Sequence, residues 1–428
     1  MRNTTLCSEG RCRPADILIR NGVIIRISAY IRDSEIPGGS GAKRYNLQGC
    51  IVTRALADVH VHFRVPGRPD KETVATGSAA AARGGYSCVC PMPNLNPVPD
   101  SPKNLREELK LIRREGTVDI IPYASITKGR EGREVVDIAA LKGSVAGFSD
   151  DGSGVQDDAV MKEAMRRTAA EGCILAAHCE DSSLPAGSPE SEWKQIARDA
   201  ALAAETRCKY HVCHISTRES AEIIRKAKAS GCDISCETAP HYLTLCEDDR
   251  QDDGRFKMNP PLHTAADREA LIEALADGTI DMIATDHAPH TAEEKSRGFE
   301  GSAMGIIGLE TAFPVLYTKL VRTGRITLEK LVEVMAEAPR RRFGLDGRSK
   351  NPAGIREGEA ADLAVFDVSN EFTIDPSEFR SKGRSTPFEG WKVYGKCLLT
   401  FCRGRRVWSD AALAGKMEGA AGGGGGSR

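Results

Sequence analysis

The chain has 428 residues, with 59 Lys and Arg against 60 Asp and Glu, which gives a net charge of −1. This length predicts a large barrel-type domain with a smaller one, or two to three ordinary domains. No long basic run is present, which argues against a nucleic-acid partner, and no apolar stretch is long enough to cross a membrane. Met1-Arg2-Asn3-Thr4 is not followed by the apolar core of a signal peptide, so we expect a cytoplasmic protein.

Fourteen cysteines are scattered along the chain. They do not form the paired CxxC elements of a zinc ribbon, and a chain of this size needs no disulfide framework. Several fall inside predicted strands, where a free cysteine packs as a small hydrophobe. We therefore expect the cysteines to be reduced packing residues.

Both ends of the chain predict short β-strands. Near the N-terminus, Asn21-Gly22 stands between two apolar runs, which is a strong hairpin signal. Near the C-terminus, 361–366 and 396–408 have the pattern of strands, with a turn at Arg403-Gly404. We predict that the two ends pair into one small β-sandwich domain, followed by a flexible glycine-rich tail.

Between these ends, short apolar strands alternate with helical stretches such as 72–83, 159–170 and 218–229. Eight candidate strands lie at 57–62, 86–91, 118–123, 144–149, 173–178, 209–214, 232–237 and 280–286. Strands that alternate with helices form parallel sheets, and eight of them indicate an α/β fold of the (β/α)8 TIM-barrel type. The predicted domains are 1–54 and 347–412 for the two parts of the small domain, 55–346 for the barrel, and 413–428 for the tail.

Polar residues follow the predicted strands. His60 and His62 stand two apart at the end of the first strand, so their side chains point the same way. The later strands end in Asp150-Asp151, His178, His214 and Asp286. In a barrel of this type the chemistry lies at the carboxyl ends of the strands. Imidazole and carboxylate are the ligands that zinc and similar divalent ions prefer, so the pattern indicates a metal-dependent hydrolase.

Seven segments of the sequence resemble the bacterial-type (class I) dihydroorotases of the amidohydrolase superfamily, and the resemblance extends from the N-terminal hairpin to about Trp408. The segments are Asp58-Val59-His60-Val61-His62-Phe63-Arg64-Val65-Pro66-Gly67, Pro91-Met92-Pro93-Asn94, Ser149-Asp150-Asp151-Gly152, His178-Cys179-Glu180, His211-Val212-Cys213-His214-Ile215-Ser216-Thr217, Lys257-Met258-Asn259-Pro260-Pro261-Leu262 and Thr285-Asp286-His287-Ala288-Pro289-His290.

The resemblance implies an enzyme with two zinc ions per subunit. His60, His62 and Asp286 would bind the first ion and His178 and His214 the second. Asp151 would bridge the two ions; Asp150 stays an alternative, because the sequence does not separate adjacent carboxylates. A hydroxide held by the metal ions would attack the ring amide of dihydroorotate, with Asp286 as the general base and acid.

The resemblance also implies the substrate contacts and the partners. Arg64, Asn94 and His290 would hold the substrate carboxylate, Asn259 would contact the ring, and the Met304-Gly305 backbone would supply a further contact. The reaction is the reversible cyclisation of N-carbamoyl-L-aspartate to L-dihydroorotate in pyrimidine biosynthesis. We expect a homodimer, and an association with aspartate carbamoyltransferase stays open.

Two alternatives remain. Hydantoinases, dihydropyrimidinases and allantoinases share parts of the motif set, but many of these relatives bridge their metals with a carbamylated lysine, whereas the fourth strand here, 143–149, has none. A non-catalytic assembly subunit would lack some of the ligands, all of which are present. Among the other polar residues, we expect His211 to face away and pack, His241 to be structural, and Glu180 to pair with a nearby cation.

Overall fold

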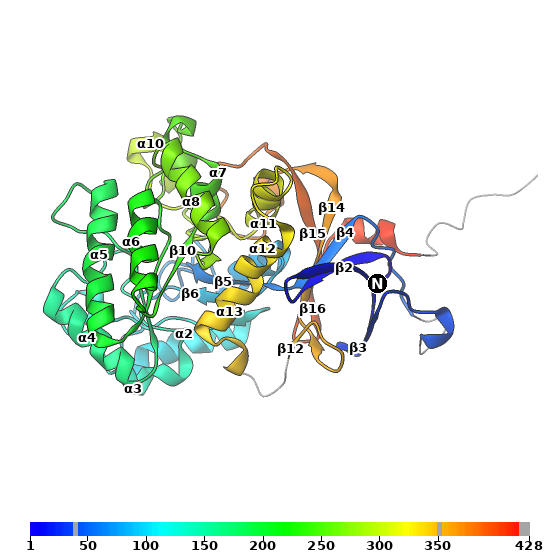
Figure 1. Ribbon diagram of the computed structural model, residues 1–428, viewed down its shortest axis with the longest axis horizontal. Helices are drawn as coiled ribbons and strands as arrows, with labels where there is room; N and C mark the ends of the chain where they lie inside the picture. Colours follow the sequence, from blue (N-terminus) through cyan, green and yellow to red (C-terminus); the bar gives the residue numbers. More distant parts are fainter. Residues whose placement is uncertain (37–41, 349–352, 419–428) are drawn as a thin grey trace, which may run out of the picture.

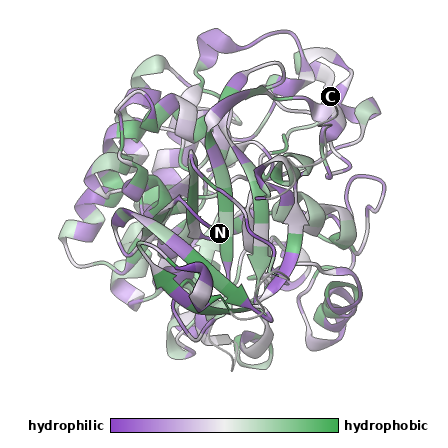
Figure 2. Cartoon of the chain, turned by 90° about the vertical axis from the view of Figure 1, so that its right-hand side faces the viewer, coloured by the Kyte–Doolittle hydropathy of each residue, from purple (hydrophilic) through white to green (hydrophobic). Residues whose placement is uncertain are grey.

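The computed structural model describes residues 1–36, 42–348 and 353–418. A region of parallel strands surrounded by helices occupies one side, and a sheet built from both chain ends occupies the other (Figure 1). Helices α4, α5 and α6 lie on the side away from that sheet, and β5, β6 and β10 lie between. Figure 2, in which the sheet built from the chain ends faces the viewer, shows hydrophobic residues along its strands.

The central strands are parallel and form two hydrogen-bonded groups, β5-β6-β7 and β8-β9-β10-β11. Their bounds are β5 Leu56–Val61, β6 Tyr86–Pro91, β7 Asp119–Ile120, β8 Ile174–Ala177, β9 Lys209–Val212, β10 Ile234–Thr238 and β11 Met282–Ile283. Isolated parallel bridges connect the groups at both edges: Ala124 to Phe148 and Phe148 to Leu175 on one side, and Val61 to His287 on the other. The result is the α/β arrangement that the alternating pattern predicts.

The helices between and after these strands include those that the sequence predicts, and α6 has the predicted bounds. They are α1 Val74–Gly84, α2 Pro102–Glu115, α3 Ile138–Leu141, α4 Asp158–Ala170, α5 Pro189–Thr206, α6 Arg218–Ala229, α7 Pro240–Thr244, α8 Ala265–Asp277, α9 Ala292–Lys295, α10 Gly298–Gly301, α11 Ala312–Leu316, α12 Leu328–Val332 and α13 Ala338–Phe343. Most begin at a Ser, Thr or Asp whose side chain accepts a hydrogen bond from the first turn, such as Ser188 at α5.

The fourth predicted strand, 144–149, is not a regular strand. Lys142–Ser144 form a 3-10 turn, and only Phe148 makes strand-type bridges. Gly147 comes so close to its neighbour that a Cβ atom there would stand 2.9 Å from the Ile174 carbonyl oxygen. Its backbone nevertheless bonds to both neighbours: the Ala146 N–H donates to the Pro122 carbonyl at 2.8 Å, and the Phe148 N–H donates to the Ile174 carbonyl at 3.0 Å. These bonds bring Ser149, Asp150 and Asp151 to the end of the neighbouring strands.

The two chain ends form one continuous nine-stranded sheet in the order β12-β13-β3-β2-β1-β4-β14-β15-β16. The strands are β1 Thr4–Ser8, β2 Arg11–Arg20, β3 Val23–Ser28, β4 Cys50–Arg54, β12 Ala353–Gly354, β13 Ala360–Ala361, β14 Leu363–Thr373, β15 Lys392–Cys402 and β16 Arg405–Ser409. The ends meet where β4 pairs with β14, with Val52 opposite Val365. The pairing of the two ends is as predicted, but two separate layers of a sandwich are not distinguished among the described strands.

Two details of the small domain differ from the predictions. Cys7 and Cys12, which face each other across β1 and β2, form a disulfide, so the expectation that every cysteine is reduced is wrong for this pair. The predicted tail begins too early, because Ala411–Lys416 form a 3-10 helix and Leu413 is buried. Of the remaining predicted segments, 419–428 of the tail and 349–352 of the C-terminal part lie outside the described residues.

The predicted turn at Asn21-Gly22 joins β2 to β3, with both residues in the left-handed region at φ 51° and 79°. The turn at Arg403-Gly404 joins β15 to β16, and the two turns touch. A Cβ atom on Gly22 would collide with the carbonyl oxygen of Gly404, whereas a Cβ atom on Gly10, at φ +70°, would meet nothing within 4 Å. Gly22 is therefore fixed both by its φ angle and by its neighbour.

These two glycines separate backbone strain from a steric clash. We expect Gly10→Ala to lower the free energy of unfolding by about 1–2 kcal/mol, since only the left-handed φ opposes a Cβ atom there. Gly22→Ala should cost a further ~1–3 kcal/mol, because the turn of β15 and β16 must move away. Urea unfolding measures both changes. Equal losses in the two variants would show that the contact with Gly404 does not constrain the sheet.

Candidate metal centre

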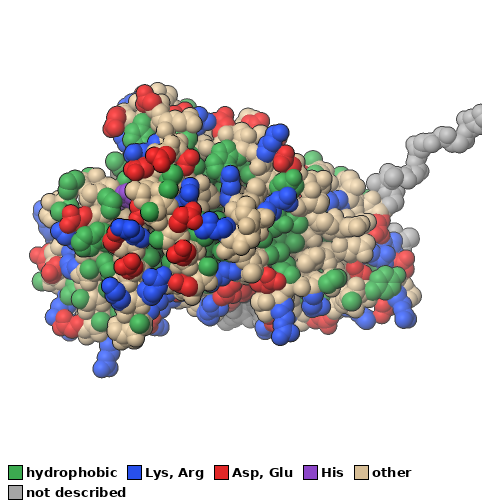
Figure 3. All heavy atoms as spheres, turned by 45° about the horizontal axis from the view of Figure 1, so that its top comes forward, with side chains coloured by type: hydrophobic (Ala, Val, Ile, Leu, Met, Phe, Trp, Pro, Cys, Tyr) green, Lys and Arg blue, Asp and Glu red, His purple; other side chains and the backbone are tan. Residues whose placement is uncertain are grey.

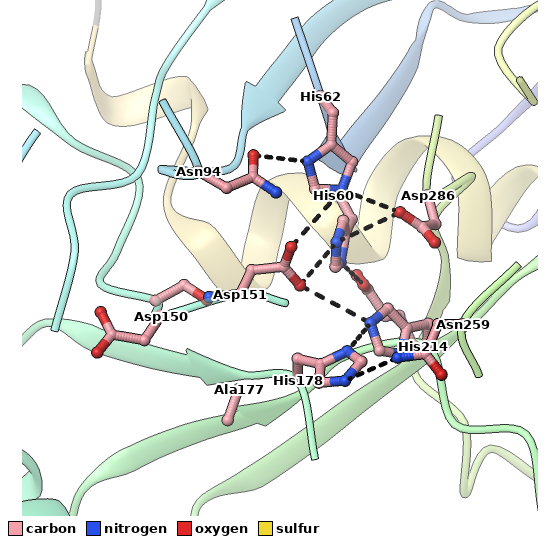
Figure 4. A network of polar contacts seen from close by, with 12 residues as sticks. His60, His62, Asn94, Asp150, Asp151, Ala177, His178, His214, Asn259 and Asp286 are labelled. Carbon is pink, nitrogen blue, oxygen red and sulfur yellow. Dashed lines mark hydrogen bonds and ion pairs between the residues drawn. The ribbon is translucent and has the colours of Figure 1, made fainter. Parts of the chain in front are cut away.

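Six side chains from the strand ends converge on one buried point (Figure 4). His60 lies in β5, and the others follow their strands directly or after a short turn. His60 Nε2 is 3.3 Å from Asp151 Oδ1, His62 Nε2 is 3.1 Å from Asp286 Oδ1, and His178 Nδ1 is 3.0 Å from His214 Nε2. The structure thus brings together the six residues that the sequence predicts as metal ligands: His60, His62, Asp151, His178, His214 and Asp286.

The two adjacent aspartates point in different directions. Asp151 directs its carboxylate between His60 and His62 (Figure 4), with Oδ2 3.6 Å from His62 Nε2. Asp150 turns away and accepts hydrogen bonds from the backbone N–H groups of Ile126 at 2.8 Å and Thr127 at 3.1 Å. Asp151 is therefore the member of the pair that faces the imidazoles, and Asp150 fixes the neighbouring loop.

Three acceptors orient the imidazoles from behind. His60 Nδ1 donates to Glu237 at 2.8 Å, His178 Nε2 donates to Glu180 at 3.2 Å, and His62 Nδ1 donates to the Asn94 side-chain oxygen at 2.9 Å. A carboxylate behind a metal-bound histidine fixes the ring and its tautomer. Each ring then presents its unprotonated nitrogen to the centre of the cluster.

The role of Glu237 is not evident from the sequence. Ser235 and Glu237 alternate in β10, so they share a face, and both bond to His211: Ser235 at 2.8 Å and Glu237 at 3.2 Å. The alternation of two polar residues in a buried strand is the local sequence feature that could have indicated this supporting role. His211 packs against Phe343 as predicted, but it is also connected to His60 of the cluster through Glu237. Glu180, expected to pair with a cation, instead accepts from His178 and from the Asn259 amide at 3.0 Å.

The carboxylates of the cluster are held ionised. Burial alone would raise the pKa of Asp151, but His60 and His214 hold it well below the usual range. Burial likewise opposes ionisation of Asp286, and His62, His60 and His214 lower its pKa. Behind them, burial would raise the pKa of Glu237, but His211 and His60 lower it to about 2. The centre is therefore a buried site with negative charge and imidazole lone pairs directed at it.

This donor set fits divalent cations. Two groups of ligand atoms, His60 with His62 and Asp151, and Asp151 with His178 and His214, each lie within 4.8 Å of one another. Buried His60 Nε2 and His214 Nδ1 have no hydrogen-bond partner. His178 Nδ1 faces His214 Nε2 although the proton of His178 is directed to Glu180. Two cations that share Asp151 would use His60 Nε2, His178 Nδ1 and His214 Nε2 as ligands, since these are the nitrogens that face the cluster.

The backbone at the centre is strained. Arg64, His214 and Asp286 have φ angles of 60°, 31° and 47°, in the left-handed region that side chains other than glycine rarely adopt. Such strain is concentrated at functional sites. It also explains why β9 ends at Val212 and β11 at Ile283, earlier than predicted: the chain leaves the strand conformation in order to aim His214 and Asp286.

The residues predicted to bind the substrate border this cluster from several loops. Arg64 Nε donates to the Pro289 carbonyl at 3.2 Å, and its Nη2 is 3.4 Å from His290 Nε2, which lies 2.7 Å from the Met304 carbonyl oxygen. Asn94 reaches the cluster through His62 and Asn259 through Glu180. Gly305 follows Met304 and donates its N–H to the Lys257 carbonyl at 3.0 Å.

Another histidine, His241, lies near Asp286 and His214 of the cluster. It lies in α7, is buried, and packs its ring against Tyr242, while its Nε2 has no hydrogen-bond partner. Burial lowers its pKa to about 4. The structural role that we expect for His241 is compatible with this packing.

Comparisons with known proteins place the chain among cyclic amidases. The family model described as "Dihydro-orotase-like" matches residues 49–193. The chain is similar to the dihydroorotase of Bacillus cytotoxicus, with 44% identity over 95% of this chain and 97% of that one. The dihydroorotase of Geobacillus sp. (strain WCH70) is also 44% identical, over 94% of this chain and 96% of that one.

Solved structures of hydantoinases share the fold. The L-hydantoinase (dihydropyrimidinase) from Arthrobacter aurescens has a TM-score of 0.82 and 27% identity, and the match covers 95% of each chain. A D-hydantoinase structure also has a TM-score of 0.82, at 22% identity, and covers 96% of this chain and 95% of that one.

The adjacent aspartates provide a matched test of the metal centre. Loss of a group that only supports a metal ligand weakens metal binding by about 10–100-fold, so we expect Asp151→Asn to weaken it at least that much. Asp150→Asn should keep the metal content and instead lower the free energy of unfolding by about 1–3 kcal/mol, because the buried Thr127 hydroxyl loses the carboxylate oxygen to which it donates. Metal analysis and urea unfolding of both variants measure these two effects. Normal metal content in Asp151→Asn would contradict the assignment.

Proposed function

The chain belongs to the dihydroorotase family, and we propose that it catalyses the reversible cyclisation of N-carbamoyl-L-aspartate to L-dihydroorotate, a step of pyrimidine biosynthesis. The observation that carries this proposal is the position of Arg64 and His290, 3.4 Å apart, beside the buried cluster that contains Asp286. A cation at that position suits a substrate that has a carboxylate next to its reacting ring amide.

We propose zinc as the metal, since imidazole and carboxylate donors suit it. His60, His62 and Asp286 would hold one ion, His178 and His214 the other, and Asp151 both. When bound, such ions lower the pKa of water and polarise a carbonyl group. We also interpret the bridged parallel strands as a (β/α)8 barrel, whose carboxyl-end loops carry the site.

In the hydrolytic direction, the oxygen of water adds to the ring amide carbon and the carbon–nitrogen bond breaks. Asp286 is ionised, so it can take the proton that the water loses and deliver it to the departing nitrogen. The product carries a new carboxylate and a ureido NH2 group. Ring closure is the reverse: Asp286 takes a proton from the ureido nitrogen as it attacks the carboxyl carbon, and one water leaves.

The loop residues that border the cluster would hold the substrate during these steps. The Arg64 guanidinium has a planar fork that matches a carboxylate, and its Nε is fixed by the Pro289 carbonyl. His290 and Asn94 would complete the carboxylate site, and Asn259 with the Met304-Gly305 backbone would contact the ring. Burial, with Arg64 and Lys71, lowers the pKa of His290 to about 4, so it would act as a neutral donor.

Hydantoinase activity is the alternative that the fold itself raises, because solved hydantoinases share it. Two features oppose it. The predicted fourth strand, 143–149, has no lysine that could be carbamylated, and Arg64 with His290 would serve a carboxylate that hydantoin lacks. The proposal also extends to a homodimer and to contact with aspartate carbamoyltransferase, which the mass of the protein in solution, alone and with that enzyme, would test.

Turnover of dihydroorotate by the purified, zinc-loaded protein tests the proposal. We expect hydrolysis at high pH and cyclisation of N-carbamoyl-aspartate at low pH, because the ring closes from the protonated carboxyl. Asp286→Asn is the control: it should lose most turnover and keep the ion held by Asp151, His178 and His214. Turnover of hydantoin or allantoin without turnover of dihydroorotate would refute the proposed substrate.

Replacement of Arg64 separates substrate choice from catalysis. A hydrogen bond to a charged group contributes about 1.5–3 kcal/mol, so Arg64→Met should lower kcat/KM for dihydroorotate by about tenfold or more. Metal content should stay normal, because Arg64 does not face the ions. Loss of metal with an unchanged KM would instead show that Arg64 has a structural role.

A further inference from the structure

Lys295 is a buried lysine that has no role in the reaction proposed above. It ends the short helix α9, its exposed fraction is 8%, and it forms no salt bridge within the part of the chain that the structure describes. Its Nζ donates to three backbone carbonyls: Gly305 at 2.7 Å, Ala303 at 2.8 Å and Lys257 at 3.0 Å. An ammonium group has three N–H donors, so each of them has an acceptor.

These carbonyls belong to two loops that are far apart in the sequence. Lys257 stands two residues before Asn259, and Ala303 and Gly305 flank Met304. The loops also bond directly, since Gly305 N–H donates to the Lys257 carbonyl at 3.0 Å. Lys295 itself is connected through α9 to Thr291, the N-cap that follows His290. Three segments that border the proposed substrate site therefore meet at one nitrogen atom.

The packing leaves little freedom around this junction. A Cβ atom on Gly254 would collide with the Lys295 carbonyl oxygen and with Ser302 Oγ. The Ala303 N–H donates to the Glu294 carbonyl at 2.9 Å, and Tyr242 Oη donates to the Pro260 carbonyl at 2.6 Å. The loops are thus anchored on several sides, and the Lys295 ammonium bonds to both of them.

A buried charge without a counter-ion requires a reason, because an apolar side chain would be buried at lower cost. Burial, with a smaller contribution from Lys257, lowers the pKa of Lys295 to about 8. The three carbonyls explain why a lysine stands there: without it, the Ala303 and Gly305 carbonyls would lose this donor, and the Lys257 carbonyl would keep only the Gly305 N–H. A methionine of similar length would fill the space and bond to neither loop.

We propose that Lys295 is a positioning residue that fixes the two loops, and with them Asn259 and the Met304-Gly305 backbone, at the distance from His290 that the substrate requires. This inference rests on the proposed function for the identity of the substrate, but the junction itself does not. Displacement of a binding group by about 1 Å is enough to cost a large part of the rate. Lys295 would act through its neighbours, without touching the substrate.

The test compares Lys295→Met with Lys162→Met, which removes an exposed lysine on α4 that pairs with Glu205 and bonds to neither loop in the described residues. We expect Lys295→Met to raise the KM for dihydroorotate by about tenfold or more while kcat changes less and metal content stays normal. Hydrogen exchange should become faster in 254–262 and in 302–306 together, and the control should change neither quantity. If Lys295→Met does not fold, Lys295→Gln is measured instead. Because it keeps two N–H donors, we expect a smaller rise in KM and a smaller increase in exchange in the same two loops.

Two results would overturn the inference. Unchanged exchange in both loops would show that Lys295 does not hold them, whatever the substrate. Faster exchange spread evenly over the chain with an unchanged KM would show that Lys295 serves only overall stability. If the wild-type protein does not turn over dihydroorotate, the proposed function fails, but the exchange experiment still tests the junction because it needs no substrate.

Discussion

The burial of two carboxylates among four imidazoles is the constraint on which the rest of the site depends. Each of these groups would be costly to bury alone. Together they offset one another, because the imidazoles hold the pKa values of Asp151 and Asp286 low while burial opposes ionisation. Parallel strands make this possible, since their carboxyl ends bring residues from distant parts of the sequence to one place.

The supporting residues follow from the same constraint. An imidazole whose outer nitrogen is bonded to an acceptor presents a lone pair inward, and Glu237, Glu180 and Asn94 each impose this on one ring. Over the face shown in Figure 3, by contrast, acidic and basic side chains are interspersed. The low pKa of Asp151 keeps it ionised, so under the proposed function it would bridge the cations without chemical modification of a lysine.

Much of this could be predicted from the sequence where the signals are local. The strand Tyr86–Pro91 and the helix Arg218–Ala229 have the predicted bounds because apolar periodicity is local. The choice between Asp150 and Asp151 could not be made, since it depends on which carboxylate meets the 126–127 loop. The support of His60 by Glu237 joins residues far apart in the chain. The early ends of β9 and β11 follow from the positive φ angles of His214 and Asp286, which these residue types do not predict.

The nine-stranded sheet makes the two ends of the chain dependent on each other during synthesis. Strand β4 pairs with β1 on one edge and with β14 on the other, but β14 leaves the ribosome only after every central strand and helix α13 have been made. Until then the hydrophobic edge of β4 is open, and open strand edges promote association with other chains. A nascent chain that stops after α13 therefore already contains all six residues of the cluster and has an unprotected edge. Its fate is decided by aggregation rather than by the chemistry of the site.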